Sequence, residues 1–127
     1  MTKVVLDASA ILAVLQLEAG ADVVADHLAN AHVSAVNVSE VVAKLIEKGQ
    51  TLADARKVID MLAFTIEDFD IALGFAAGAL RRPTKPYGLS LGDRACLATA
   101  AKLAVPVLTT DRLWAKIDIG VDVKVVR

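Results

Sequence analysis

Short apolar runs alternate along the chain with longer segments of helical periodicity. The expected strands are short and rich in β-branched residues: Val4–Leu6, His32–Ala35, Phe64–Ile66, Pro106–Thr109 and Val121–Val126. The expected helices lie between them: Ser9–Leu15, Ala21–Leu28, Asn37–Lys48, Thr51–Leu62, Asp70–Leu80 and Ser90–Leu103. The segment Arg81–Gly88 contains two prolines and a glycine, and we expect a loop there. The alternation predicts an α/β fold with helices on both sides of a mostly parallel sheet.

The size and composition of the chain fit one domain over residues 1–127. Its apolar share of 56% is somewhat higher than usual, which hints at a surface covered by a partner, although richness in alanine explains it equally well. The single cysteine, Cys96, cannot form an internal disulfide, which suits a reducing compartment. We see no membrane span and no leader at the start of the chain, so the expected location is cytoplasmic.

The net charge of −1 argues mildly against a broad nucleic-acid-binding face, but it leaves room for a local basic patch.

Four acidic residues stand where the expected elements meet. Asp7 ends the first strand, Asp111 follows the strand that ends at Thr109, and Glu40 and Asp93 lie in the first turns of two helices. In a parallel sheet, strand ends and the helix starts after them share one edge, where ligand sites form. These four carboxylates are therefore candidates to converge.

Each acid also has an ordinary structural explanation. Ser90 to Asp93 matches a capping box, Asn37 to Glu40 is a looser version of one, and Asp7 and Asp111 could cap the segments that follow them. Taken together, however, three or four carboxylates at one edge would repel each other, and a divalent cation would relieve that repulsion. Oxygen ligands suit Mg²⁺ or Mn²⁺ rather than zinc.

Other chemistries have little support in the sequence. There is no phosphate-binding loop, no GxGxxG and no GxSxG. His27 and His32 fit no ligand spacing, and Cys96 is expected to pack in the core.

Four motifs, in this order and at these separations, resemble a PIN domain, and more narrowly the VapC-type ribonuclease toxins of toxin–antitoxin pairs. They are VVLDASAIL, VSEVVAKL, LSLGDRACLATA and PVLTTDRLW, and they run from Val4 to Trp114. The resemblance implies a PIN-like three-layer sandwich, with Asp7, Glu40, Asp93 and Asp111 as the catalytic ligands of Mg²⁺ or Mn²⁺. It also implies that Ser9 and Thr109 act as hydroxyl groups beside them.

The reaction that the resemblance implies is hydrolysis of RNA phosphodiester bonds, in tRNA, rRNA or mRNA. RNA requires cationic contacts, and the candidate substrate-binding residues are Arg81, Arg82, Lys85, Arg94 and Arg112. Each of these could equally be a solvated surface charge. Tyr87 and Trp114 could stack on bases, although for Trp114 packing against the last strands is the preferred expectation.

The resemblance also implies partners: a homodimer, and a cognate antitoxin that blocks the toxin in a hetero-oligomer. The alanine- and valine-rich helices Ala21–Leu28, Asn37–Lys48 and Thr51–Leu62 could supply an apolar groove for it, or could simply face the core. The alternatives to a ribonuclease are an RNA-binding module without turnover, another Mg²⁺-dependent phosphoryl hydrolase, and a DNA nuclease.

Overall fold

Five short parallel strands form one sheet at the centre of the molecule. The computed structural model describes residues 2–127, so Met1 of the expected domain lies outside this range. The strands are β1 (Val4–Leu6), β2 (Ala31–Ser34), β3 (Thr65–Glu67), β4 (Val107–Thr109) and β5 (Val123–Val125). Their order is β3-β2-β1-β4-β5, and every neighbouring pair is parallel. Since β1 lies in the middle, Asp7 emerges at the centre of the carboxyl edge.

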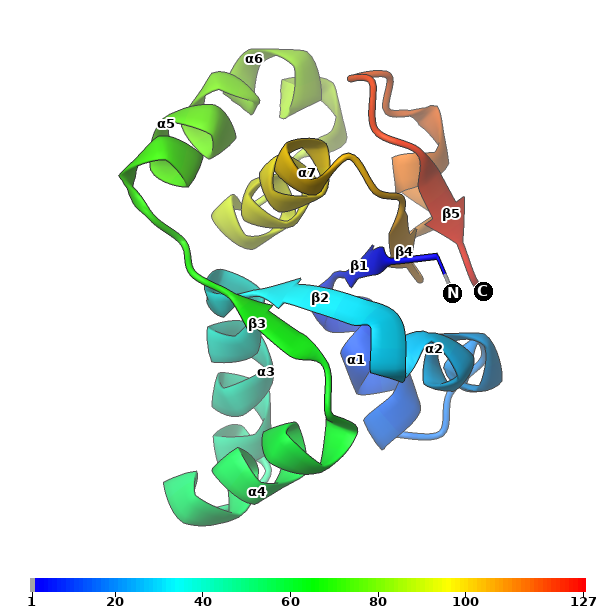
Figure 1. Cartoon of the computed structure of the whole chain (residues 1–127), viewed down its shortest axis with the longest axis vertical. Helices are drawn as coiled ribbons and strands as arrows, with labels where there is room; N and C mark the ends of the chain where they lie inside the picture. The colour runs from blue at the N-terminus through cyan, green and yellow to red at the C-terminus, as the bar shows by residue number, and fades with distance from the viewer. Residues whose placement is uncertain (1) are drawn as a thin grey trace.

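Helices cover both faces of the sheet, which confirms the expected three-layer sandwich (Figure 1). On one face lie α1 (Ala8–Leu15), α2 (Ala21–His27), α3 (Ala35–Glu47) and α4 (Leu52–Leu62). On the other lie α5 (Ile71–Ala79), α6 (Arg81–Thr84) and α7 (Leu91–Leu103). Three 3₁₀ turns complete the chain: η1 (Leu28–Asn30), η2 (Lys85–Tyr87) and η3 (Arg112–Lys116). Within residues 2–127, none of the helices has the length and apolar character that a membrane crossing requires.

The alternation of side chains along β1 divides the core into two halves. Val4 and Leu6 pack with the α1–α4 layer, whereas Val5 packs with residues of α7 and with Trp114. All three β1 side chains are buried. The strand is thus apolar on both faces, as is typical of a central parallel strand, and it fixes the chain rigidly up to Asp7.

Several helix caps follow the sequence pattern, but the start of α3 does not. Ser90 caps α7, as predicted, and Thr51, the first residue of the expected segment Thr51–Leu62, caps α4. The helix predicted to begin at Asn37 instead begins at Ala35, because the hydroxyl of Ser34 accepts a hydrogen bond from the Val36 N–H and caps it there. The prediction that Asn37 is a cap was therefore wrong, and Asn37 lies buried inside the helix.

The segment predicted as a loop before α7 is largely helical. It forms α6 and η2 and turns at Gly88, which has a φ of 64°. Pro83 is tolerated because it lies in the first turn of a very short helix, where its missing N–H removes no helical hydrogen bond. The hydroxyl of Thr84 donates to the carbonyl of Leu80 and ties this turn to the preceding helix.

Candidate functional site

Asp7 is a buried carboxylate held by three donors. It is 4% exposed and lies between the end of β1 and the start of α1. Its Oδ1 accepts from the Ser9 hydroxyl at 2.7 Å and from the Ala10 N–H at 2.8 Å. Its Oδ2 accepts from the Thr109 hydroxyl at 2.5 Å. Asp7 therefore caps α1 and also joins β1 to β4 through side chains.

These hydrogen bonds do not fully offset the free-energy cost of burying the charged Asp7 carboxylate. Loss of solvent raises the pKa of Asp7 from its ordinary 3.8 to about 6, against the hydrogen bonds from Thr109, Ser9 and Ala10, which lower it. The negative charge of Asp93 raises the pKa further. The site thus holds a carboxylate whose charged form is poorly stabilised by the chain alone.

Glu40 is held against the start of α7 by Asn37. The Asn37 side-chain N–H donates to Glu40 Oε1 at 2.8 Å and to the carbonyl of Gly92 at 3.0 Å. A Cβ built on Gly92 would overlap the Glu40 carboxylate, so the carboxylate lies directly on the glycine backbone. Gly92 immediately precedes Asp93, and this contact therefore brings the acids of α3 and α7 to the same place.

Asp93 belongs to a complete capping box. The Ser90 N–H donates to Asp93 Oδ2 at 2.9 Å, and the Asp93 N–H donates to the Ser90 hydroxyl at 3.2 Å. The predicted cap is confirmed, and it fixes the carboxylate at the positive end of the α7 dipole.

The buried thiol of Cys96 is affected by the negative charges of three of the acids. Burial raises the pKa of its thiol well above the ordinary value, and Asp7, Asp93 and Glu40 raise it further in that order. Carboxylates affect a thiol in this way only when they lie near it. The structure thus brings Asp7, Glu40 and Asp93 into one electrostatic neighbourhood at the carboxyl edge. The predicted core packing of Cys96 is also confirmed, because the residue is fully buried.

Asp111 stands at the margin of this group. Its N–H donates to the Thr109 hydroxyl at 3.1 Å, which links it to Asp7 through one side chain. Its own Oδ1 accepts from the Leu113 N–H at 3.0 Å and caps η3. Asp111 is exposed, as is Glu40.

The donor set fits a hard divalent cation, provided that the side chains move. Within residues 2–127, no three acidic, histidine or cysteine side chains form a group that could hold a metal ion as they stand. Yet the donors are all carboxylate oxygens, and the ion pairs formed by the described residues involve none of these four acids. Oxygen donors of this kind suit Mg²⁺ or Mn²⁺. Glu40 is exposed and Asp93 is partly exposed, so a cation can reach both carboxylates from solvent.

Comparison with known families decides the class of the chain. The sequence profile of the PIN domain family matches residues 4–120. The chain belongs to the PIN domain family. No curated protein sequence matches the chain significantly.

Solved structures share the fold of this PIN domain at low sequence identity. A chain of DNA-bound VapBC from Salmonella typhimurium is 16% identical with a TM-score of 0.75, and the alignment covers 100% of both chains. A chain of VapBC-1 from nontypeable Haemophilus influenzae is 15% identical with a TM-score of 0.73, covering 98% of each chain. A toxin–antitoxin complex from Klebsiella pneumoniae contains a chain that is 21% identical with a TM-score of 0.72, covering 94% of this chain and 95% of that one.

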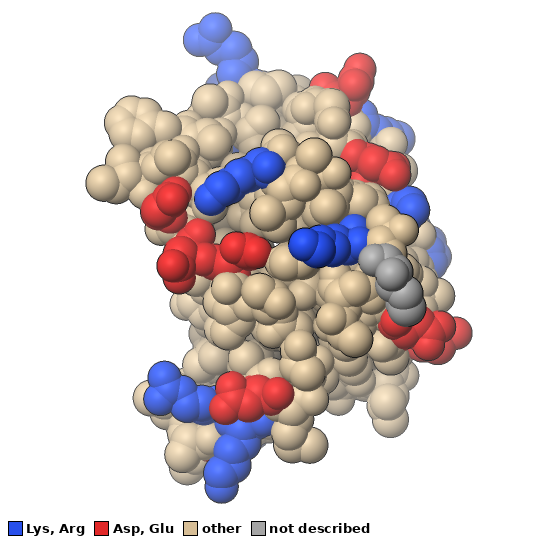
Figure 2. Space-filling view, in the orientation of Figure 1, with Lys and Arg blue, Asp and Glu red and all other residues tan. Residues whose placement is uncertain are grey.

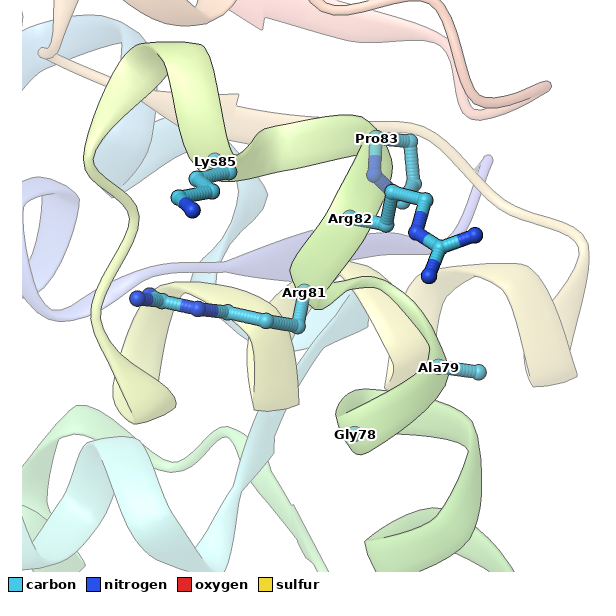
Figure 3. A pocket seen from close by; sticks show the side chains of 6 residues that line it. All are labelled: Gly78, Ala79, Arg81, Arg82, Pro83 and Lys85. Atoms are coloured by element: carbon cyan, nitrogen blue, oxygen red, sulfur yellow. The ribbon is translucent and has the colours of Figure 1, made fainter.

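The basic candidates of the PIN domain lie in three places. Arg81, Arg82 and Lys85 line a hollow of about 620 Å³ on α6, and Figure 3 shows Arg81 and Lys85 on one side of it with Arg82 on the other. Arg112 is exposed at the start of η3. Arg94 is half-buried, and its guanidinium donates to the carbonyl of Ala77 at 3.0 Å, so it ties α7 to α5.

The two aromatic candidates are also placed. Trp114 is 1% exposed and packs with Val5 and Cys96, which confirms the preferred expectation of packing. The hydroxyl of Tyr87 donates to the carbonyl of Lys116 at 3.1 Å.

Sequence reasoning missed two residues of this site, Asn37 and Gly92. A signal for Asn37 was present, since it shares the buried face of α3 with Val41 and Leu45 at a spacing of four residues. A polar residue in such an apolar row indicates a specific hydrogen-bonding role. Gly92 gave no comparable signal, because the contact that excludes a side chain comes from another helix.

Proposed function

We propose that this PIN domain is a divalent-metal-dependent endoribonuclease of the VapC toxin type, acting as a single domain over residues 1–127. The catalytic ligands are Asp7, Glu40, Asp93 and Asp111, and the metal is Mg²⁺ or Mn²⁺. Membership of the PIN family supports the nuclease class. The fold shared with VapBC structures supports the toxin assignment.

The observation that carries the proposal is that three carboxylates act on one buried thiol, while none of them forms an ion pair with a basic side chain of the described residues. The negative charges of Asp7, Asp93 and Glu40 all raise the pKa of the buried Cys96 thiol, so the three carboxylates act on the same point of α7. When bound there, a divalent cation stabilises charge on a phosphate and activates water as a nucleophile. The chain's own part is to hold the acids, with Ser9 and Thr109 fixing the orientation of Asp7.

The RNA backbone is proposed to follow the basic hollow. Arg81 and Lys85 point to the same side of α6, as two contacts to neighbouring phosphates require (Figure 3). This hollow lies at the end of α5 that packs near the start of α7, since Arg94 bonds to Ala77 there. Arg94 ties the start of α7 to this end of α5, and Arg112 is a further exposed contact beside Asp111.

An apolar segment of a cognate antitoxin is the proposed blocking partner. The α1–α4 layer exposes several large apolar side chains: Leu17, Ile46, Leu52 and Met61. A hollow of about 360 Å³ between α1 and α3 is lined in part by Leu12, Ala43 and Glu40. A segment bound in it would therefore contact one of the proposed ligands directly.

A homodimer is proposed to form through α5. Ile71 and Phe75 are 81% and 79% exposed on one stripe of this helix, and Gly74 and Gly78 leave open space beside them. Acidic residues precede α5 and basic residues follow it, so two copies packed antiparallel would match opposite charges at both ends. Figure 2 shows acidic side chains gathered where Figure 1 places the connection from β3 to α5.

Phe75→Asp is expected to convert the dimer into a monomer, because the charge enters the centre of the apolar stripe. Light scattering after size exclusion measures the mass, and Met61→Asp on α4 is the control, since Met61 is 83% exposed. An unchanged dimer in Phe75→Asp would place the contact elsewhere. A monomeric wild type would contradict the dimer itself.

Cleavage of total RNA by purified, antitoxin-free protein tests the proposed function. We expect cuts that leave 5′-phosphates in Mn²⁺ or Mg²⁺ and none in EDTA, because the carboxylates alone supply no nucleophile. Single-stranded DNA and a phosphomonoester are tested in parallel. Turnover of only one of these would indicate a DNA nuclease or a phosphatase, and RNA binding without any turnover would indicate a binding module.

A further inference from the structure

Asn37 is a buried polar residue that the reaction described above does not use. It is 1% exposed at the boundary between α3 and α7. Asparagine is a poor residue for a helix interior, and an amide is costly to bury unless its hydrogen bonds are made. An apolar residue would extend the Val41 and Leu45 row of the same face without that cost. The hydrogen bonds that Asn37 makes must therefore offset the cost of burying its amide.

Those contacts join two helices at the site. One amide nitrogen donates both to Glu40 Oε1 at 2.8 Å and to the carbonyl of Gly92 at 3.0 Å. The first contact spans three residues of α3, and the second spans 55 residues of chain. Asn37 thus fixes the Glu40 carboxylate and the start of α7 relative to each other.

Gly92 completes the arrangement by leaving space for the carboxylate. A Cβ at this position would overlap the Glu40 carboxylate. The atoms it would displace are the far end of a flexible side chain, so an alanine here would move Glu40 rather than disrupt the backbone. The Glu40 carboxylate also gains from the positive end of the α7 dipole.

We propose that Asn37 is a positioning residue which, together with Gly92, holds Glu40 beside Asp93 before any metal binds. The inference rests on the proposed function, in which Glu40 and Asp93 are metal ligands. Both contacts of this side chain are made by its N–H groups, one to the Glu40 carboxylate and one to the backbone that precedes Asp93.

Two variants separate positioning from structural support. Asn37→Leu keeps the branching and the number of side-chain heavy atoms and removes both hydrogen bonds. Gly92→Ala leaves Asn37 intact, favours the helix and displaces the carboxylate. Thr99→Val is the matched control, because Thr99 is a 1% exposed residue of α7 whose hydroxyl bonds only within its own helix, to the Ala95 carbonyl.

Calorimetric titration of metal-free protein with Mn²⁺ is the measurement, alongside melting temperatures in EDTA. We expect Asn37→Leu and Gly92→Ala to weaken Mn²⁺ binding by about 10-fold to 100-fold, which is typical for residues that orient ligands. Thr99→Val should bind like wild type, and Gly92→Ala should melt close to wild type.

Either of two results would overturn the positioning role. One is a Mn²⁺ affinity of Gly92→Ala equal to that of wild type. The other is a loss of Mn²⁺ affinity in Asn37→Leu that is explained by a lower melting temperature of that variant. If wild type itself bound no Mn²⁺, the metal site would be wrong and the positioning role would fall with it. That failure is distinguishable, because it appears in the wild type and in the Thr99→Val control.

Discussion

Asp7→Asn is expected to abolish RNA cleavage and, at the same time, to stabilise the metal-free protein at neutral pH. Activity should fall by at least about 100-fold, because a neutral amide is a poor ligand for a hard cation. Stability should rise because the substitution removes a buried charge and keeps the shape. The two effects have opposite signs, so a loss of activity by unfolding is excluded within one variant.

The pH dependence of this stabilisation has a definite sign. The pKa of Asp7 is about 6 in the folded protein and 3.8 ordinarily, so the folded state binds this proton more tightly. Its favourable contribution to the free energy of unfolding is present below pH 3.8 and is lost as pH rises through 6. A shift of this size corresponds to about 3 kcal/mol at neutral pH.

Urea unfolding in EDTA between pH 4 and pH 8 measures this difference. The advantage of Asp7→Asn over wild type should grow as pH rises from about 4 to 7, and Mn²⁺ should remove it by stabilising wild type alone. Asp60→Asn, on the exposed side of α4, is the control. An Asp7→Asn protein that is less stable than wild type at pH 7 would mean that the carboxylate is well satisfied without metal.

Thr109→Val is expected to make Mn²⁺ binding more sensitive to acid. The Thr109 hydroxyl makes the largest of the contributions that lower the pKa of Asp7, and valine removes it without changing the shape. The pKa of Asp7 should then rise further, so that protons compete with the metal at a higher pH. Asp111 also loses its link to Asp7, because its N–H bonds to the same hydroxyl.

Apparent Mn²⁺ dissociation constants between pH 5.5 and pH 8 test this expectation. Affinity in Thr109→Val should be about 10-fold to 100-fold weaker near neutral pH and should recover partly at pH 8. Thr110→Val changes the neighbouring residue in the same way and should behave like wild type. An equal loss of Mn²⁺ affinity at every pH would mean that Thr109 orients the Asp7 carboxylate and does not act by lowering its pKa.

Much of the fold could be predicted because its signals are local. The apolar run of β1, the Thr51 and Ser90 caps and the alternation of strands and helices each depend on neighbouring residues. The parallel sheet then follows because helices lie between successive strands and return the chain to the same edge of the sheet. The same reasoning predicts that four acids lie at one edge of the sheet: Asp7, Glu40, Asp93 and Asp111.

The remaining features depend on contacts between distant segments. Ser34 and Asn37 are both acceptable helix caps, and the end of β2 decided between them. Pro83 and Pro86 suggested a loop, but one turn of helix accommodates Pro83 at its start. Gly92 is explained only by a carboxylate from α3 that lies on it. No local pattern carries such information.

The position of β1 in the sheet also controls when the site can exist. Asp7 leaves the ribosome well before its partner Thr109, which lies 102 residues later and is brought to it by the pairing of β4 with β1. Folding during synthesis proceeds from the first residues onward, and long-range pairings form last. A chain that has not yet reached β4 therefore carries Asp7 without the strand that orients it, and a cell translating this protein meets a complete site only after β4 has emerged.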